Sequence, residues 1–158
     1  MVFMRAEEAI SGKMGKAFAT INGEIHEMFY VKDIEARIEK KKTEIPVLGY
    51  TGTQHKAGGW SGKGQMTIYY VTSLFRKMML EYVRTGRDIY FDIAIANDDP
   101  TSSTGRQVTL LKGVNLDSVL IAKLDVESEA LDEEVPFTFN DVDMPEQFRQ
   151  LWQTNSPR

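Results

Sequence analysis

The sequence has no cysteine among its 158 residues, which excludes several kinds of chemistry at once. Without thiols there are no disulfide bridges, no thiolate metal sites and no cysteine nucleophile. Histidine is almost as scarce, because His26 and His55 are the only two and neither belongs to an HExxH motif or a His-rich cluster. No nucleophile-elbow glycine pattern supports a catalytic triad. We therefore expect surface or turn histidines, no metal, no cofactor and no enzymatic activity.

An excess of positive charge is also lacking. The formal net charge is -4 and the isoelectric point is near 5.3, which argues against a protein whose main task is to neutralise nucleic-acid phosphates. No stretch approaches the roughly 20 apolar residues of a membrane span, and acidic residues occupy the place of a signal-peptide core. We expect a soluble protein made in the cytoplasm, with no membrane insertion.

What is present is the composition of an ordinary globular protein. Hydrophobic residues make up 42% and charged residues 27%, with no internal repeat and no linker that would separate domains. A chain of this length can bury about 70% of its unfolded surface in one core. We expect a single domain over residues 1–158, with a polar tail that frays from about residue 150.

Strand patterns dominate the chain. Asn22-Gly23 predicts a tight hairpin turn, since both residues tolerate positive φ. Residues 30–49 fit period two and also helical spacing, with Glu and Lys favouring a helix; we expect a long, half-exposed strand. Alternation over residues 87–97 gives the clearest strand. Further strands are expected in residues 65–71, 106–116, 118–128 and 135–139.

One segment has the pattern of a helix. The apolar residues of "LFRKMMLEYVRTG", starting at Leu74, fall on one helical face. Thr72 or Ser73 can cap its start, and Gly86 stands where a C-terminal glycine is expected. Runs of strands without alternating helices indicate an antiparallel fold. The predicted fold class is therefore mainly β, an antiparallel sandwich or barrel with one flanking α-helix.

A glycine-rich stretch at about residues 50–64 lacks periodicity, and we expect a long mobile loop there. Its sequence invites a phosphate-binding interpretation, but Ala57 replaces the first glycine of a Walker A loop and Gly64 replaces the hydroxyl residue. A β-rich run follows, so no helix N-terminus would face an anion. A flexible or interface loop is the favoured interpretation, and Trp60 on it either contacts a partner or folds back over its own sheet.

Charge is distributed unevenly along the chain. Residues 125–146 are acidic and contain no Lys or Arg, whereas "EKKK" at 39–42 is a basic cluster. The acidic stretch lacks a DxDxDG loop, so a solvated negative face is favoured over a cation site. Unlike patches suit head-to-tail association of identical subunits. The candidate subunit or ring interface residues are Trp60, His55, Lys56, Lys63, Lys40, Lys41 and Lys42.

Four segments together resemble phage tail tube proteins, and within them the XkdM-like tube proteins of PBSX-type defective prophages. These segments are "ISGKMGKAFATINGEIHEMFYVKDIEARIEKKKTEIPVLG", "GGWSGKGQMTIYY", "YVRTGRDIYFDI" and "DSVLIAKLDVESEALDEEVPFTFNDVDMPEQF". The resemblance covers nearly the whole chain and carries no catalytic signature. It implies a structural subunit that joins with itself into hexameric rings, which stack into the inner tube of a contractile tail.

The resemblance also implies partners and a location. Tail sheath, tape-measure and baseplate proteins would be partners, DNA would be passing cargo, and the subunit would move from the host cytoplasm into a virion or phage-like particle. It implies that residues 50–64 form an interface arm ordered on assembly, and that residues 32–42 join rings or face the lumen.

Other functions stay open at this point. A tube protein of a secretion or bacteriocin machine would have the same fold. An enzyme could use residues 55–64 for a nucleotide, and a monomeric single-stranded nucleic-acid binder could stack bases on Trp60, Tyr69 or Tyr70.

Overall fold

The structure, a computed structural model, describes residues 6–149, which form a mainly antiparallel β protein with one α-helix. This confirms the predicted fold class. The described residues fall into two compact units. The first holds residues 6–29, 91–112 and 142–149, and the second holds residues 30–90 and 113–141. The tail predicted to fray from about residue 150 lies outside the described residues.

The first unit is built on a short antiparallel sheet with hydrogen-bonding order β2-β1-β5-β6, in which β8 also pairs with β6. The Asn22-Gly23 turn between β1 and β2 has φ angles of 52° and 82°, so the predicted hairpin is confirmed. The elements of this unit are a 3-10 helix (Ala6–Glu8), β1 (Gly15–Ile21), β2 (Glu24–Glu27), β5 (Phe91–Asp98), the first part of β6 (Arg106–Leu116) and β8 (Asp141–Glu146).

Alternate residues of the first unit's central strands form its core. Ala19 and Ile93 are fully buried opposite one another, and Phe91 lies on the same face of β5. The loop after β5 is fixed by Asp99, whose carboxylate accepts hydrogen bonds from the Thr101 hydroxyl (2.6 Å) and from the backbone N–H groups of Ser11 (3.0 Å) and Thr101 (2.9 Å). These donors, the Thr101 hydroxyl first, lower the pKa of Asp99.

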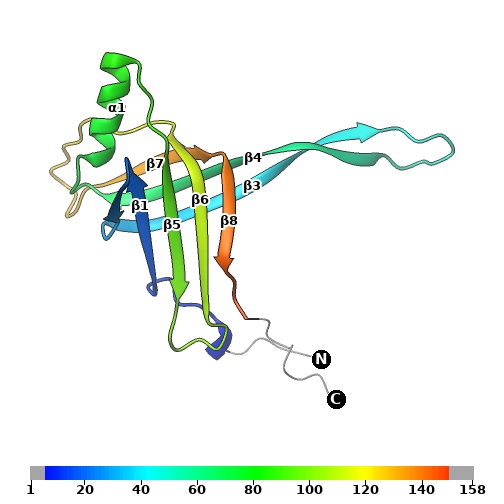
Figure 1. The fold of residues 1–158 in the computed structure, drawn as a ribbon, viewed down its shortest axis with the longest axis horizontal. Coiled ribbons are helices and arrows are strands. Elements are labelled where there is room, and N and C mark those ends of the chain that lie inside the picture. Colours follow the sequence, from blue (N-terminus) through cyan, green and yellow to red (C-terminus); the bar gives the residue numbers. More distant parts are fainter. Residues whose placement is uncertain (1–5, 150–158) are drawn as a thin grey trace. The chain divides into compact units, whose positions relative to one another are not determined.

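The second unit contains the longest strands, with hydrogen-bonding order β6-β7-β4-β3 (Figure 1). The strand predicted over residues 30–49 is confirmed as β3, because pairing with β4 along its length outweighs the helix propensity of its Glu and Lys residues. The elements of this unit are β3 (Val31–Ile45), β4 (Gln54–Tyr69), α1 (Leu74–Thr85), the end of β6 and β7 (Asp132–Phe139).

Helix α1 has the ends that the sequence predicts. Gly86 adopts the left-handed conformation at φ 74°, and its N–H donates to the Tyr82 carbonyl at 2.8 Å. At the start, the Thr72 hydroxyl accepts a hydrogen bond from the Leu74 N–H at 3.2 Å. Phe75 and Met78 form the buried face of the helix. The sequence therefore predicted both helix boundaries.

The core of the second unit follows the period-two pattern of β7. Val135, Phe137 and Phe139 are buried on one face of this strand, together with Met66 and Ile68 of β4. The Tyr30 and Phe75 rings meet edge to face with centroids 6.4 Å apart. Strand β7 begins at Asp132, three residues before the predicted strand.

Two sequence predictions are corrected by the strand pairing. The strand expected at residues 118–128 is wrong, because these residues connect β6 to β7 outside the sheet, and residues 121–130 are all exposed. The two edges of β7 are already paired with β4 and β6, so this segment finds no partner strand there. Strand β8 was missed, since "DVDMPE" has a weak pattern and its pairing with β6 is distant in sequence.

Candidate assembly surface

The β3–β4 hairpin extends beyond the rest of its sheet. Strand β7 pairs with β4 only from Gly62 to Tyr69, whereas β3 pairs with β4 as far as Ile45 opposite Gln54. We call residues 39–61 the arm, and Figure 1 shows it running on as two strands alone. Every residue from 35 to 60 is exposed. Two isolated strands are marginally stable in water, so the arm lacks the support that the other strands have.

The loop expected at about residues 50–64 is wrong from Gln54 onward. Strand β4 begins there, and residues 46–53 form the tip that joins it to β3. The missing periodicity is explained by exposure of both faces of the arm. The same geometry argues against a phosphate cradle. Residues 54–64 are an extended strand paired with β3, and successive amides of a strand point to opposite edges, so they do not converge on one anion. Mobility of this segment stays a prediction.

The glycines near the base of the arm serve packing. A Cβ atom on Gly62 would lie 2.4 Å from the Phe139 ring, and one on Gly64 would lie 2.3 Å from the Phe137 ring. These glycines let two buried aromatic rings of β7 cross the backbone of β4. Gly59 has a different role, because its φ of 120° suits glycine at an irregularity in the strand.

That irregularity lies within the arm, close to where the arm joins the rest of the second unit, which we call the body. The register shifts between Lys40, opposite Trp60, and Lys42, opposite Ala57. Strand β4 has one extra residue here, because Gly58 and Gly59 stand opposite the single Lys41. Such a bulge bends a ribbon and increases its twist. The basic cluster and Trp60 therefore stand at the bend.

The predicted interface residues all lie on this hairpin. Lys63 is at its base, opposite Arg37, and the others are on the arm. Trp60 has an exposed fraction of 44%, so it is only half covered by its own chain. It lines a pocket of about 440 Å³ at the base of the arm, with Ser61, Gly62, Lys63, Thr138, Phe139 and Asn140. The structure brings these residues together on one hairpin, and their role in an interface stays a prediction.

The tip of the arm carries apolar side chains that the sequence analysis missed. The exposed fractions are 40% for Val47, 103% for Leu48 and 61% for Tyr50. The apolar run "IPVLGY" was the available signal. Residues 40–56 contain four lysines and one glutamate, a net charge of +3. The arm is therefore basic with an apolar end.

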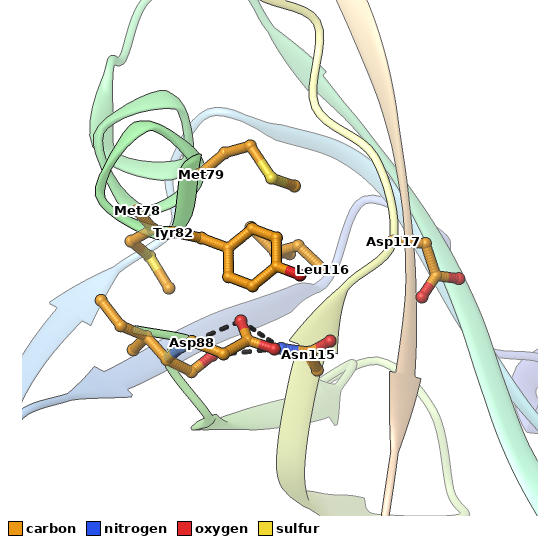
Figure 2. A pocket seen from close by; sticks show the side chains of 8 residues that line it. Met78, Met79, Tyr82, Asp88, Asn115, Leu116 and Asp117 are labelled. Carbon is orange, nitrogen blue, oxygen red and sulfur yellow. Dashed lines mark hydrogen bonds between the residues drawn. The ribbon is translucent and has the colours of Figure 1, made fainter. Parts of the chain in front are cut away.

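A second pocket lies at the other end of this unit, beside α1 (Figure 2). Its volume is about 290 Å³, and an Asp88 carboxylate oxygen accepts hydrogen bonds from Asn115 Nδ2 at 2.9 Å and from the Ile89 N–H at 3.0 Å. These bonds fix the chain after α1, and the lining residues include no histidine, cysteine, serine or lysine. The pocket is lined by Met78, Met79, Tyr82, Asp88, Ile89, Asn115, Leu116 and Asp117.

The solvated acidic face predicted around residue 133 is wrong for Glu133 itself. Its side chain is 1% exposed and lies 2.5 Å from Arg76 Nη1 of α1. Arg76 also donates to the carbonyls of Thr72 and Leu120, and it lies 4.3 Å from the centre of the Tyr70 ring. A buried carboxylate needs such a partner. This ion pair joins α1 to β7 and is structural.

The aromatic residues considered for nucleic-acid stacking do not form one platform. Trp60 and Tyr69 are nine residues apart on β4, which separates them by about 30 Å along the strand. Because the separation is odd, their side chains also point to opposite faces of the sheet. The Tyr70 ring is covered by Arg76. Among the residues that the structure describes, no group of three His, Cys, Asp or Glu side chains could hold a metal ion.

Comparison with known proteins decides the family. The family model described as "Phage tail tube protein" matches residues 2–146. The chain belongs to the phage tail tube protein family. The phage-like element PBSX protein XkdM of Bacillus subtilis (strain 168) is 47% identical over 143 residues, which cover 90% of this tail tube protein and 95% of XkdM. The predicted resemblance is confirmed.

Two further comparisons agree with this assignment. The uncharacterised protein YqbM of the same strain is 47% identical over 149 residues, covering 94% of this chain and 99% of YqbM. A chain in the sheath-tube complex of an extracellular contractile injection system, PVC, has the same fold with a TM-score of 0.62 at 14% identity, covering 88% of this tail tube protein and 93% of that chain. None of the helices in residues 6–149 has the length and apolar character needed to span a membrane.

Proposed function

We propose that this tail tube protein is a structural subunit of the inner tube of a contractile phage or phage-like particle. It assembles with itself into stacked rings of six subunits, which form a conduit. The fold it shares with a chain of a contractile injection system supports the contractile class. The subunit carries no catalytic task in this role.

The observation that carries the proposal is the unsupported arm. The arm is a two-stranded ribbon with exposed backbone edges and a half-covered Trp60. In a monomer such open edges promote aggregation, because their N–H and C=O groups are unpaired. In a ring or stack the same edges and side chains become the interface. Strand β3 ends the hydrogen-bonding order of its sheet, so its outer edge is also available to a neighbouring subunit.

The proposed partners follow from this role. Sheath, tape-measure and baseplate proteins would meet the assembled tube, and DNA would pass through it as cargo. A net charge of -4 suits a conduit that does not hold DNA. Assembly would take place in the host cytoplasm, and the product would be the tail of a virion or phage-like particle. A tube of a secretion or bacteriocin machine remains the alternative with the same subunit design.

Negative-stain electron microscopy across protein concentrations, with light scattering on the same samples, tests this function. We expect rings or tubes for the natural chain. As a control, residues 41–59 are replaced by Asn-Gly, which closes the Lys40 and Trp60 pair with a two-residue turn. This variant should stay folded by circular dichroism and stay monomeric. A natural chain that is a monomer at every concentration would contradict the proposal.

A further inference from the structure

The connection between β6 and β7 exposes apolar side chains that its own chain does not cover. We call residues 121–131 the acidic loop. The exposed fractions are 53% for Ile121, 91% for Leu124 and 93% for Val126. Exposed apolar residues that cluster on one short segment mark an interaction surface more often than single ones do. We therefore treat the acidic loop as a candidate interaction surface.

The charge of the acidic loop restricts what that partner can be. Asp125, Glu127 and Glu129 alternate with its apolar residues. Lys123, the single basic residue of the loop, donates to the Asp132 carbonyl at 2.9 Å and lies 3.9 Å from the Asp132 carboxylate, so its charge is turned toward β7. The outward charge is negative, which disfavours nucleic acid and anionic lipid as partners.

The acidic loop is held in a defined shape. The Glu127 N–H donates to the Asp125 carboxylate at 3.0 Å, and the Ser128 hydroxyl donates to the Ala130 carbonyl at 2.8 Å. Just before the loop, Arg76 reaches the Leu120 carbonyl at 3.4 Å. A surface that is already ordered loses less entropy when it binds.

The arm has the complementary properties within the same chain. Its tip exposes Val47, Leu48 and Tyr50, and the lysines of residues 40–56 give it a net charge of +3. Lys42 precedes the tip by four residues and Lys56 follows it by three. Apolar side chains of the tip would therefore meet those of the acidic loop, while the carboxylates of the loop would face the lysines further down the arm. Such pairing of unlike charges fixes partner choice and register.

A single subunit cannot join these two surfaces. The acidic loop leads into Asp132, the first residue of β7, which pairs with Tyr69 at the end of β4, whereas the tip precedes Gln54 at its start. The 15 residues between Gln54 and Tyr69 place the two surfaces about 50 Å apart along one strand. Figure 1 shows the arm leaving in the direction opposite to the β6–β7 connection. Contact between them must come from two copies.

We propose that the arm tip of one subunit docks on the acidic loop of a second copy of this chain. This inference rests on the proposed self-assembly and names the surface that receives the arm. Because the contact joins two different patches, it is head to tail and propagates from copy to copy into a ring or a stack. The apolar contacts supply affinity, and the charges select the register.

Charge reversal on each side tests the contact. One variant changes three of the four lysines of the arm to glutamate, a second changes the three acids of the loop to lysine, and a third combines all six changes. Each single-sided variant should raise the protein concentration needed for assembly at least tenfold, because like charges then face one another. The combined variant should recover most of the natural behaviour. The changes are Lys40→Glu, Lys41→Glu and Lys42→Glu on the arm, and Asp125→Lys, Glu127→Lys and Glu129→Lys on the loop.

A control with the same charge change elsewhere is available on and just after α1. Lys77→Glu, Arg84→Glu and Arg87→Glu together reverse three exposed charges that belong to neither surface, and assembly should change little. Circular dichroism confirms that each variant is folded. Single-sided variants that assemble like the natural chain would overturn the docking contact while leaving the tube function intact. The docking contact would also be overturned if both single-sided variants lost assembly and the combined variant did not recover it. A natural chain that never assembles would remove the proposed function itself.

Discussion

Strand β4 passes through two environments, and the contrast separates what holds the subunit together from what it offers to others. From Gly62 to Tyr69 the strand lies between β3 and β7, with Met66 and Ile68 fully buried. From Gln54 to Ser61 it has only β3 beside it, and from Gln54 to Trp60 every residue is exposed. The body stabilises the fold, whereas the arm contributes little to it. Substitutions in the body should therefore change the free energy of unfolding, whereas substitutions in the arm should change assembly.

The largest effect on stability is expected at the buried ion pair of the body. Glu133→Ala would leave Arg76 buried without its carboxylate and lower the free energy of unfolding by about 3–5 kcal/mol. Glu134→Ala, one residue along and exposed, is the matched control and should change it by less than about 0.5 kcal/mol. Urea unfolding of both variants measures the difference. Equal effects would show that the pair does not support the body.

A smaller effect is expected from overpacking the glycines of β4. Gly64→Ala places a methyl group against the Phe137 ring and should cost about 1–3 kcal/mol. Gly58→Ala on the arm meets Thr43 Oγ1 at an ordinary 3.7 Å and should leave the unfolding free energy nearly unchanged. Thermal and urea unfolding compare the two. If Gly58→Ala were the more destabilising change, the division between body and arm would be misplaced.

The smallest effect is expected in the first unit and depends on pH. The pKa of Asp99 is lowered in the folded chain, so its contribution to stability is present above the ordinary carboxylate pKa and is lost as pH falls through the folded value. Asp99→Asn should therefore flatten the decline of the unfolding midpoint between neutral and acidic pH, and Asp98→Asn on the neighbouring residue should not. A decline of the same slope in Asp99→Asn would contradict this role.

Elements fixed by local chemistry were predictable from the sequence. The Asn22-Gly23 turn and the Gly86 helix end need only the positive φ that those residues tolerate. Alternation at the start of β5 correctly placed Phe91 and Ile93 in the core. These signals depend on neighbours within a few residues, and so they can be recognised in the sequence before the fold is known.

Features that depend on distant partners could not be predicted. Gly62 and Gly64 suggested a mobile loop because the rings that require them, Phe139 and Phe137, lie more than 70 residues further along the chain. Residues 118–128 alternate like a strand, yet pairing on both edges of β7 leaves them outside its sheet. Of the candidate surface, the sequence predicted the lysines and Trp60, whereas the apolar tip and the position of the acidic loop required the strand register.

Hydrogen exchange on the monomer and on assembled tubes tests the central claim most directly, because both halves of β4 are read in one experiment. The account predicts that the amides of residues 62–69 are protected in both states. Those of residues 54–61 should exchange quickly in the monomer and become protected only on assembly. Equal protection of residues 54–61 in the two states would contradict the claim that the arm is completed by another copy.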